Sequence, residues 1–549
     1  MTNMGTGETH EPRAAGTHRA PMIRGRRLAL VAGLTVALVA ALGVGSASAR
    51  PAYVPSFATG QLTGFDLGAD GTPSALPGSP FAAGVSPQFP TMTPDGEHLY
   101  FSDVNGDDLG IYDVDAAGGL SNSRTTGALD APRGVAMSPD GDRLFVADDN
   151  HNQVSVFDVA ADGGLSNQRN AATSTDPFAI AVDPSGEHLW VACSADVDAF
   201  DIAADGSLSN RRPFSHLGHG EGITVTPDGQ HLYSTGAGGV TAHDIAADGS
   251  LQNRRDTAGN FFGAAVSLDG TNLYVTPGAG SDLQTYDIAP DGSLGNGRTT
   301  GIGGIGRGVS LTPDDEHVVV AARDVNQVKV YDRDAAGTLS NERSLAASNP
   351  QMFAIRPNRS PLAAFTSAPA NAGSPTSFDA TTSSDPDGTV ARYDWDFGDG
   401  NTLPNGGPAP AHTYATAGNF IVELTVTDNE GCSTALLYTG QIASCTGGAA
   451  AQATANVVIT SAGTAPETTI TKKPTRKRPK RSILRFQSSE ANSTFTCVLD
   501  GSDGHPCTSP QNYADLNRGR HTLQVAARDA EGNTDTSPAQ ARFFLRGKR

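Results

Sequence analysis

Two arginines and a glutamate stand out among the side chains that could do chemistry. Arg133 and Arg307 each come directly before a glycine and a short apolar segment, and Glu221 has the same setting. A guanidinium group can hold a carboxylate or a phosphate through two parallel hydrogen bonds, so the arginines predict a site for an anion or a sugar acid. The alternative is that these side chains form solvated salt bridges between structural units.

A histidine pattern lies beside Glu221. His216, His219 and Glu221 read HxxHxE, a spacing that could supply metal ligands or an acid–base pair. His219 and Glu221 are therefore candidate catalytic groups that would activate a water molecule. Ordinary surface-loop histidines are the alternative, because no second set of ligands lies nearby in the sequence.

The remaining motifs predict no cofactor, with calcium left open. Asp103, Asn105 and Asp107 have the alternating oxygen ligands of a calcium loop. Asp108 stands where such a loop needs glycine, and no glutamate follows at the twelfth position. A polar hairpin loop is the favoured interpretation.

An internal repeat must position these side chains. Short apolar strands are separated by turns such as Ser-Pro-Asp-Gly, in which proline presets φ and glycine accepts a positive φ. The turn position recurs every 41 to 45 residues, at Pro94, Pro139, Pro184, Pro227, Leu268, Pro313 and Pro357. This period, with three or four strands per unit, is typical of a β-propeller.

The two ends of the repeat predict how the ring closes. The chain enters the repeat with second and third strands, around Tyr53 and over 61–67, and leaves it with a first strand over 352–355. These halves would form one blade. The prediction is a seven-bladed propeller whose last blade joins both ends and so protects the exposed edges.

The repeat also places the candidate residues. Six residues before each turn position lies the start of the innermost strand, which in a propeller faces the mouth of the central channel. The residues at these seven positions are Gln88, Arg133, Phe178, Glu221, Phe262, Arg307 and Gln351. Arg133, Arg307, Gln88 and Gln351 are therefore predicted to bind the ligand. Four histidines share another repeat position and are predicted to be structural, namely His98, His188, His231 and His317.

The repeat residues resemble a known family. The pattern PDGxxLYV followed by VxVYDxxxDGxLS resembles the lactonase-type seven-bladed propellers, which include 6-phosphogluconolactonase, and is similar to the YVTN-type surface propellers, over residues 51–358. Residues 131–134 resemble the family's Gly-Pro-Arg-His segment, so Arg133 matches the family's arginine. Gly134 and Gly308 stand where histidine is common, which argues against acid–base chemistry.

The pattern changes after the propeller. The motifs SSDPDG, YDWDFGDG, HTY and VELTVTD, in this order, resemble a PKD domain, an immunoglobulin-like β-sandwich, over 360–460. This resemblance implies a spacer or interaction module in a secreted protein, and its aspartates could bind calcium or simply form turns. Residues 466–549 resemble bacterial immunoglobulin-like repeats. Their basic run, 472–481, could bind an anionic polymer or form a solvated loop.

Cysteine spacing and the leader indicate export. The PKD-like module contains Cys432 and Cys445, and the last module contains Cys497 and Cys507, which predicts one disulfide in each. Cys193 is left as a buried, inert thiol. Residues 1–49 are predicted to be a signal peptide, because arginines precede an apolar run over 28–44 and Ala47-Ser48-Ala49 then fits a cleavage site. A retained membrane anchor is the alternative, and no other stretch of the sequence could span a membrane.

The distribution of charge indicates which partners the propeller could bind. Residues 50–465 carry 48 acidic against 18 basic residues, a net charge of −30, which argues against nucleic-acid binding by the propeller. The sequence thus predicts a secreted, three-module, all-β protein that binds a small acidic ligand, a polysaccharide or a cell-surface polymer. The alternative is a lactonase-type hydrolase, in which Arg133 and Arg307 hold an acidic lactone and Glu221 or His219 activates water.

Overall fold

The computed structural model describes residues 50–127, 129–461, 463–474, 482–530 and 532–546. The predicted signal peptide and most of the predicted basic run lie outside these residues. Helix in the described part is limited to two short 3-10 turns, η1 (Arg323–Val325) and η2 (Ala449–Ala451). No described helix has the length and apolar character needed to cross a membrane.

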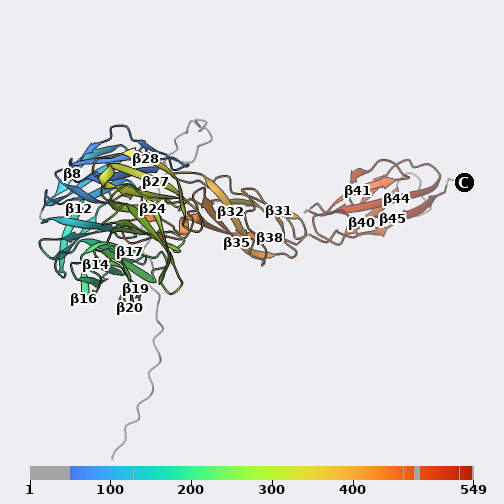
Figure 1. Ribbon diagram of the computed structural model, residues 1–549. Helices are drawn as coiled ribbons and strands as arrows, with labels where there is room; N and C mark the ends of the chain where they lie inside the picture. The colour runs from blue at the N-terminus through green and yellow to red at the C-terminus, as the bar shows by residue number, and fades with distance from the viewer. Residues whose placement is uncertain (1–49, 128, 462, 475–481, 531, 547–549) are drawn as a thin grey trace, which may run out of the picture. The chain divides into compact units, whose positions relative to one another are not determined.

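Seven sheets in the described part of the chain form the blades of a propeller (Figure 1). In six of them the strands follow one another from the centre outward in chain order. Their strands are β5 (Pro87–Met92), β6 (His98–Asp103), β7 (Asp108–Val114) and β8 (Leu120–Thr126); β9 (Pro132–Met137), β10 (Arg143–Asp148), β11 (Gln153–Val159) and β12 (Leu165–Ala172); β13 (Ala179–Val182), β14 (His188–Ala192), β15 (Asp196–Ile202) and β16 (Leu208–Ser215); β17 (Gly220–Val225), β18 (His231–Gly236), β19 (Gly239–Ile245) and β20 (Leu251–Ala258); β21 (Phe261–Val266), β22 (Asn272–Pro277), β23 (Asp282–Ile288) and β24 (Leu294–Gly301); β25 (Gly306–Leu311), β26 (His317–Ala322), β27 (Gln327–Arg333) and β28 (Leu339–Ala346).

The seventh blade joins the two ends of the propeller. It contains β29 (Ala354–Ile355), β1 (Arg50–Ser56), β2 (Gln61–Leu67) and β3 (Pro73–Ala75) in that order, with β4 (Phe81–Ala82) also paired to β2. β29 is antiparallel to β1, with Ala52 opposite Ile355 and Tyr53 opposite Ala354. The predicted seven-bladed ring, closed by strands from both ends, is confirmed.

Repeated side chains connect each blade to the next. An aromatic residue on the second strand donates a hydrogen bond to a turn glycine of the following blade: Tyr100 to Gly163 O at 2.9 Å, Trp190 to Gly249 O at 3.0 Å and Tyr233 to Gly292 O at 3.0 Å. The repeat histidines lie under the same turns and face an aspartate of their own blade, with His98 Nδ1 3.1 Å from Asp113 Oδ1. These contacts give the repeat histidines the structural role that their spacing predicts.

Two immunoglobulin-like sandwiches follow the propeller. The first packs β30 (Thr366–Ala368), β31 (Pro375–Asp379) and β34 (Ala411–Thr413) against β32 (Val390–Asp396), β33 (Thr402–Leu403), β35 (Gly418–Asp428) and β38 (Gln452–Ile459). The second packs β39 (Thr468–Lys472), β40 (Ser482–Ser488) and β43 (Gln511–Tyr513) against β41 (Thr494–Leu499), β42 (His505–Cys507), β44 (Gly519–Arg528) and β45 (Ala539–Leu545). The predicted disulfides are both confirmed, as Cys432–Cys445 and Cys497–Cys507, and Cys193 is a buried free thiol.

A buried arginine ties the propeller to the first sandwich. Arg50 is 5% exposed on β1, and its Nη1 lies 3.1 Å from Asp387 Oδ2. The same guanidinium donates to Glu430 and to the Pro357 carbonyl oxygen. The closing blade and the sandwich therefore share one buried ionic contact.

Replacing Arg50 with alanine should destabilise the protein. Arg50→Ala would leave two carboxylates uncompensated at the junction, which we expect to lower the free energy of unfolding by about 3–5 kcal/mol. Denaturant titration of the full chain measures this change. Arg392→Ala is the matched control, because Arg392 pairs with Asp394 in an exposed position and its loss should cost less than about 1 kcal/mol. Equal effects of the two substitutions would contradict a role for the junction.

We expect His243 to make the folded propeller less stable in acid. It is 3% exposed, and burial together with the nearby Arg254 lowers its pKa to about 4. Between that value and the ordinary histidine pKa of about 6.5, the unfolded chain binds a proton that the folded chain does not, so stability falls as the pH falls through this window. The blades before it have Phe157 and Phe200 at the same repeat position.

His243→Phe should therefore reduce the loss of stability in acid. We expect the melting temperature of the variant to fall less than that of the wild type between pH 6.5 and 4.5, with a difference in unfolding free energy of up to about 3 kcal/mol. Thermal unfolding at several pH values measures it. Parallel pH profiles for the two proteins would contradict the assignment.

Candidate functional site

Arg133 lies in a cluster of rim residues at the channel mouth. Its Nη1 is 3.4 Å from Gln88 Oε1, its Cζ lies 5.0 Å from the centre of the Phe178 ring, and its Nε donates to Asp149 Oδ2 at 3.0 Å. Phe178 in turn contacts Phe89 edge to face at 5.4 Å. The structure thus brings the predicted rim residues of three successive blades together.

Arg307 lies in a second cluster at the same mouth. Its Cζ is 4.0 Å from the centre of the Phe262 ring, and its Nη1 donates to Glu221 Oε2 at 3.3 Å. Glu221 therefore spans the blade of Phe262 to reach the arginine. The buried Nε of Arg307 has no hydrogen-bond partner among the described residues. Burial lowers the pKa of Arg307, and Glu221 opposes this effect.

The HxxHxE residues separate into two environments. His219 Nδ1 lies 3.8 Å from Glu221 Oε1, and its ring contacts Phe178 at 5.5 Å, so these two residues belong to the mouth. His216 is buried instead, with Nε2 3.0 Å from the Cys193 carbonyl oxygen, and burial lowers its pKa. Among the described residues, the three side chains do not form a set that could hold a metal.

The two predicted glutamines have different roles. Gln88 touches Arg133, as described. Gln351 is 3% exposed, and its amide donates to the Asn349 backbone and side-chain oxygens, each at 2.9 Å. Gln351 therefore holds its own loop, and within the described residues no arginine of the mouth contacts it.

Hydrogen bonds to the residues before β5 hold the candidate calcium loop. Asp103 accepts bonds from the Val85 and Ser86 amides at 2.7 and 2.6 Å, and Asn105 donates to Ser86 Oγ at 2.8 Å. In the PKD-like sandwich, Asp399 accepts a bond from the Asn401 amide at 3.1 Å. These side chains stabilise turns.

Glycines at the mouth allow neighbouring inner strands to approach closely. The Gly134 amide donates to the Phe178 carbonyl oxygen at 2.8 Å, and a Cβ added at Gly134 would lie 2.7 Å from that oxygen. A Cβ at Gly308 would lie 2.6 Å from the Gln351 carbonyl oxygen. These positions face the next blade, so the residues that replace the histidines common in the lactonase-type propellers serve packing between blades.

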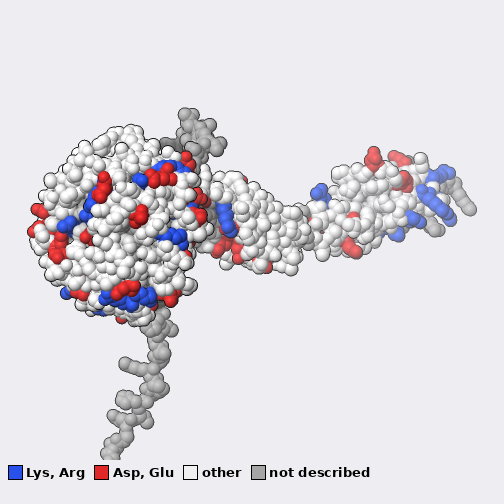
Figure 2. Space-filling view, in the orientation of Figure 1, with Lys and Arg blue, Asp and Glu red and all other residues white. Residues whose placement is uncertain are grey.

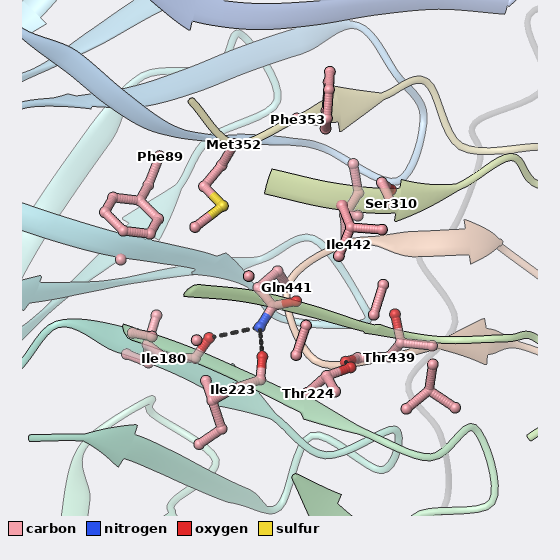
Figure 3. Close-up of a pocket in the computed structure, with 18 of the residues that line it drawn as sticks. Phe89, Ile180, Ile223, Thr224, Ser310, Met352, Phe353, Thr439, Gln441 and Ile442 are labelled. Carbon is pink, nitrogen blue, oxygen red and sulfur yellow. Dashed lines mark hydrogen bonds between the residues drawn. The ribbon is translucent and has the colours of Figure 1, made fainter. Parts of the chain in front are cut away.

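A cavity of about 100 Å³ lies below the mouth (Figure 3). Glu221 lines it at the mouth, and apolar groups including Phe89, Ile223 and Met352 form much of its wall. Thr439, Gln441, Ile442 and Ser444 of the PKD-like module also line it. The cavity therefore draws on two domains.

The segment of the PKD-like module that enters the channel is a hairpin of β36 (Leu437–Tyr438) and β37 (Ala443–Cys445). Backbone bonds connect it to three inner strands: Met137 N to Gln441 O at 3.1 Å, Val182 N to Gly440 O at 2.8 Å and Val225 N to Thr439 O at 3.1 Å. The propeller residues involved lie at the ends of inner strands, away from the mouth. The hairpin thus closes the opposite end of the channel. The hairpin was not predicted from the sequence, in which only the flanking cysteines set this segment apart.

Two family models match the sequence. One, described as a lactonase seven-bladed β-propeller, matches residues 71–182 and 256–355, and another, described as a PKD domain, matches residues 358–441. The resemblances inferred from the repeat and from the sandwich motifs are confirmed. The chain contains a lactonase-like propeller followed by a PKD domain.

The propeller is similar to solved structures. The Pseudomonas aeruginosa periplasmic gluconolactonase PpgL superposes with a TM-score of 0.50 at 20% identity, covering 56% of this chain and 99% of that one. A putative 6-phosphogluconolactonase from Bacteroides fragilis gives a TM-score of 0.49 at 19% identity, covering 56% of this chain and 98% of that one. At such identity, the likeness to PpgL shows the fold alone.

Curated relatives match over short segments. A microbial collagenase of Vibrio alginolyticus is 37% identical over 67 residues, which is 12% of this chain and 8% of that protein. The pre-pro-metalloprotease PrtV of Vibrio cholerae is 50% identical over 52 residues, which is 10% of this chain and 5% of that protein. This chain spans less than a tenth of the length of these relatives.

The close approach at Gly134 predicts a cost for any side chain there. Gly134→Ala places a Cβ against the Phe178 carbonyl oxygen, so we expect a loss of about 1–3 kcal/mol in unfolding free energy. Gly127→Ala is the control, because a Cβ at Gly127 meets no atom within 4 Å. Denaturant unfolding of both variants measures the difference. A stable Gly134→Ala variant would contradict the packing role.

Proposed function

We propose that the protein is an extracellular binding protein whose propeller holds a small organic anion in the channel mouth. The observation that supports this most directly is the setting of Arg307. Its guanidinium is stacked on Phe262 and paired with Glu221 through Nη1, while Nη2 has no hydrogen-bond acceptor among the described residues. A ligand carboxylate would supply that acceptor and form a charge-assisted hydrogen bond.

The second arginine strengthens the proposal. Arg133 shares the mouth with Arg307, and its positive charge, like burial, lowers the pKa of Arg307. Two cations at one mouth repel each other, and a bound anion would relieve that repulsion. Their stacking on Phe178 and Phe262 holds both guanidinium planes in place.

The rest of the chain fits an extracellular setting. The two disulfides and the PKD domain are consistent with an extracellular protein. The sandwiches would space the propeller or attach it to a surface. We also propose that the last module binds a polysaccharide or a cell-surface polymer through its basic run. Most of this run lies outside the described residues.

Lactone hydrolysis is the second candidate function. Glu221 lies beside Arg307, and its Oε1 faces His219. In a hydrolase, Glu221 would position and deprotonate a water molecule, and Arg307 would stabilise the negative charge that develops on the carbonyl oxygen. The match to the lactonase family model supports this chemistry as an alternative.

Titration calorimetry of the full chain with small carboxylates and sugar acids tests the binding proposal. We expect Arg307→Gln and Arg133→Gln each to weaken binding at least tenfold, because each removes a charged hydrogen-bond donor worth about 1.5–3 kcal/mol. Arg211→Gln is the control, since Arg211 lies on an outer strand and pairs with Asp198. Binding that survives both mouth substitutions would place the site elsewhere.

Hydrolysis of a lactone panel by the same proteins separates the two functions. Turnover by the wild type that is lost in Glu221→Gln would establish the hydrolase. Binding without turnover, in a protein shown to be folded, would support the binding function.

A further inference from the structure

The cavity below the mouth has a polar floor and apolar walls. Phe89, Ile180, Ile223 and Met352 surround its centre, and the Gln441 side chain reaches in from the PKD hairpin (Figure 3). The rim above it carries Glu221, which is bonded to Arg307, and Arg133 lies in the other cluster of the same mouth. A ligand held by these arginines would therefore extend its remaining atoms toward Gln441.

Two backbone carbonyls fix the orientation of the Gln441 amide. Its Nε2 donates to the Ile180 oxygen at 3.1 Å and to the Ile223 oxygen at 2.6 Å. Because both partners are acceptors, the NH₂ group must face them, and the Oε1 atom is the free end of the amide. Among the described residues, none donates a hydrogen bond to this oxygen. Gln441 thus offers one acceptor to a group in the cavity.

The hairpin is held firmly enough to define a floor. The Tyr438 hydroxyl donates to the Met137 carbonyl oxygen at 2.5 Å, and Thr91 and Thr224 donate to the Gln441 and Thr439 carbonyl oxygens at 2.9 and 3.0 Å. The Cys432–Cys445 disulfide closes the base of the segment. Side-chain and backbone bonds from four inner strands therefore set the depth at which Gln441 lies.

We infer that Gln441 of the PKD domain is a specificity-determining residue of the propeller site, and that the ligand is a short-chain carboxylate with a hydrogen-bond donor, such as a hydroxyl, at its far end. This inference rests on the proposed anion-binding function. The carboxylate lies at the arginines, the chain fills the apolar cavity, and the terminal donor meets Gln441 Oε1. Because the bonds to Ile180 and Ile223 fix the depth of Gln441, the distance from the arginines to this oxygen limits the length of the chain.

The experiment measures affinity as a function of chain length. Linear ω-hydroxycarboxylates of increasing length, and the same acids without the hydroxyl, are titrated into the full chain by calorimetry. The wild type should show an optimum length and should prefer the hydroxylated acid. Gln441→Asn should move the optimum one carbon longer, because the side chain loses one methylene and each buried methylene changes affinity about fourfold. Gln441→Ala should move the optimum further.

Further variants separate the effect of side-chain length at position 441 from the effect of the hydrogen bond to Gln441 Oε1. Gln441→Leu keeps a similar side-chain volume, so it should retain the optimum length but lose the preference for the hydroxyl at least fivefold. Gln452→Asn is the matched control, because Gln452 lies in the same domain and bonds to exposed Glu423. It should change neither property. Melting temperatures establish that each variant is folded.

The outcomes distinguish this inference from the proposed function. If the wild type binds carboxylates through Arg307 but all the Gln441 variants keep its length optimum and its hydroxyl preference, the floor assignment is wrong and anion binding stands. If the wild type binds none of the acids, both are wrong. A longer optimum in Gln441→Asn and Gln441→Ala, absent from Gln452→Asn, establishes that the PKD domain sets ligand specificity.

Discussion

The pairing of β29 with β1 is the contact on which the rest of the molecule depends. It joins residues about 300 positions apart, closes the ring and fixes the face from which the chain leaves it. Because β29 is an inner strand that starts near the mouth, the chain leaves the ring at the opposite face. There the Asn358 amide donates to the Ser444 oxygen at 2.8 Å, and the Thr446 amide donates to the Asn358 oxygen at 2.9 Å. The second domain therefore begins directly beside the end of the channel that its hairpin closes.

Close packing and charge are combined at the mouth. Glycines let adjacent inner strands approach, as at Gly134 and Phe178. The residue before each such glycine then projects over the channel, where aromatic rings support the arginines. Figure 2 shows acidic and basic side chains interspersed over the visible face of the propeller. The arginines are distinctive because they are stacked and partly buried.

The repeat register made much of this structure predictable. A constant offset from each turn located Arg133, Glu221 and Arg307 on one rim, because every blade repeats the same strand and turn geometry. Local spacing was a weaker guide, since it grouped His216 with His219 although the fold turns His216 toward Cys193. The rim offset also gave Gln351 a binding role, but its side chain bonds to Asn349. The floor could not be predicted, because the hairpin belongs to no repeat and most of its partners are backbone groups whose positions depend on the closed ring.

The hairpin makes the interior of the propeller depend on a segment that is synthesised after the ring. Every strand of the ring is available once residue 355 has been made, yet Gln441 and the second cysteine of its disulfide come some ninety residues later. A ring that folded before these residues were added would lack the hairpin that lines the cavity. The propeller therefore reaches its final interior only when the next domain has been made, and a fragment that ends with β29 is a complete ring around an incomplete pocket.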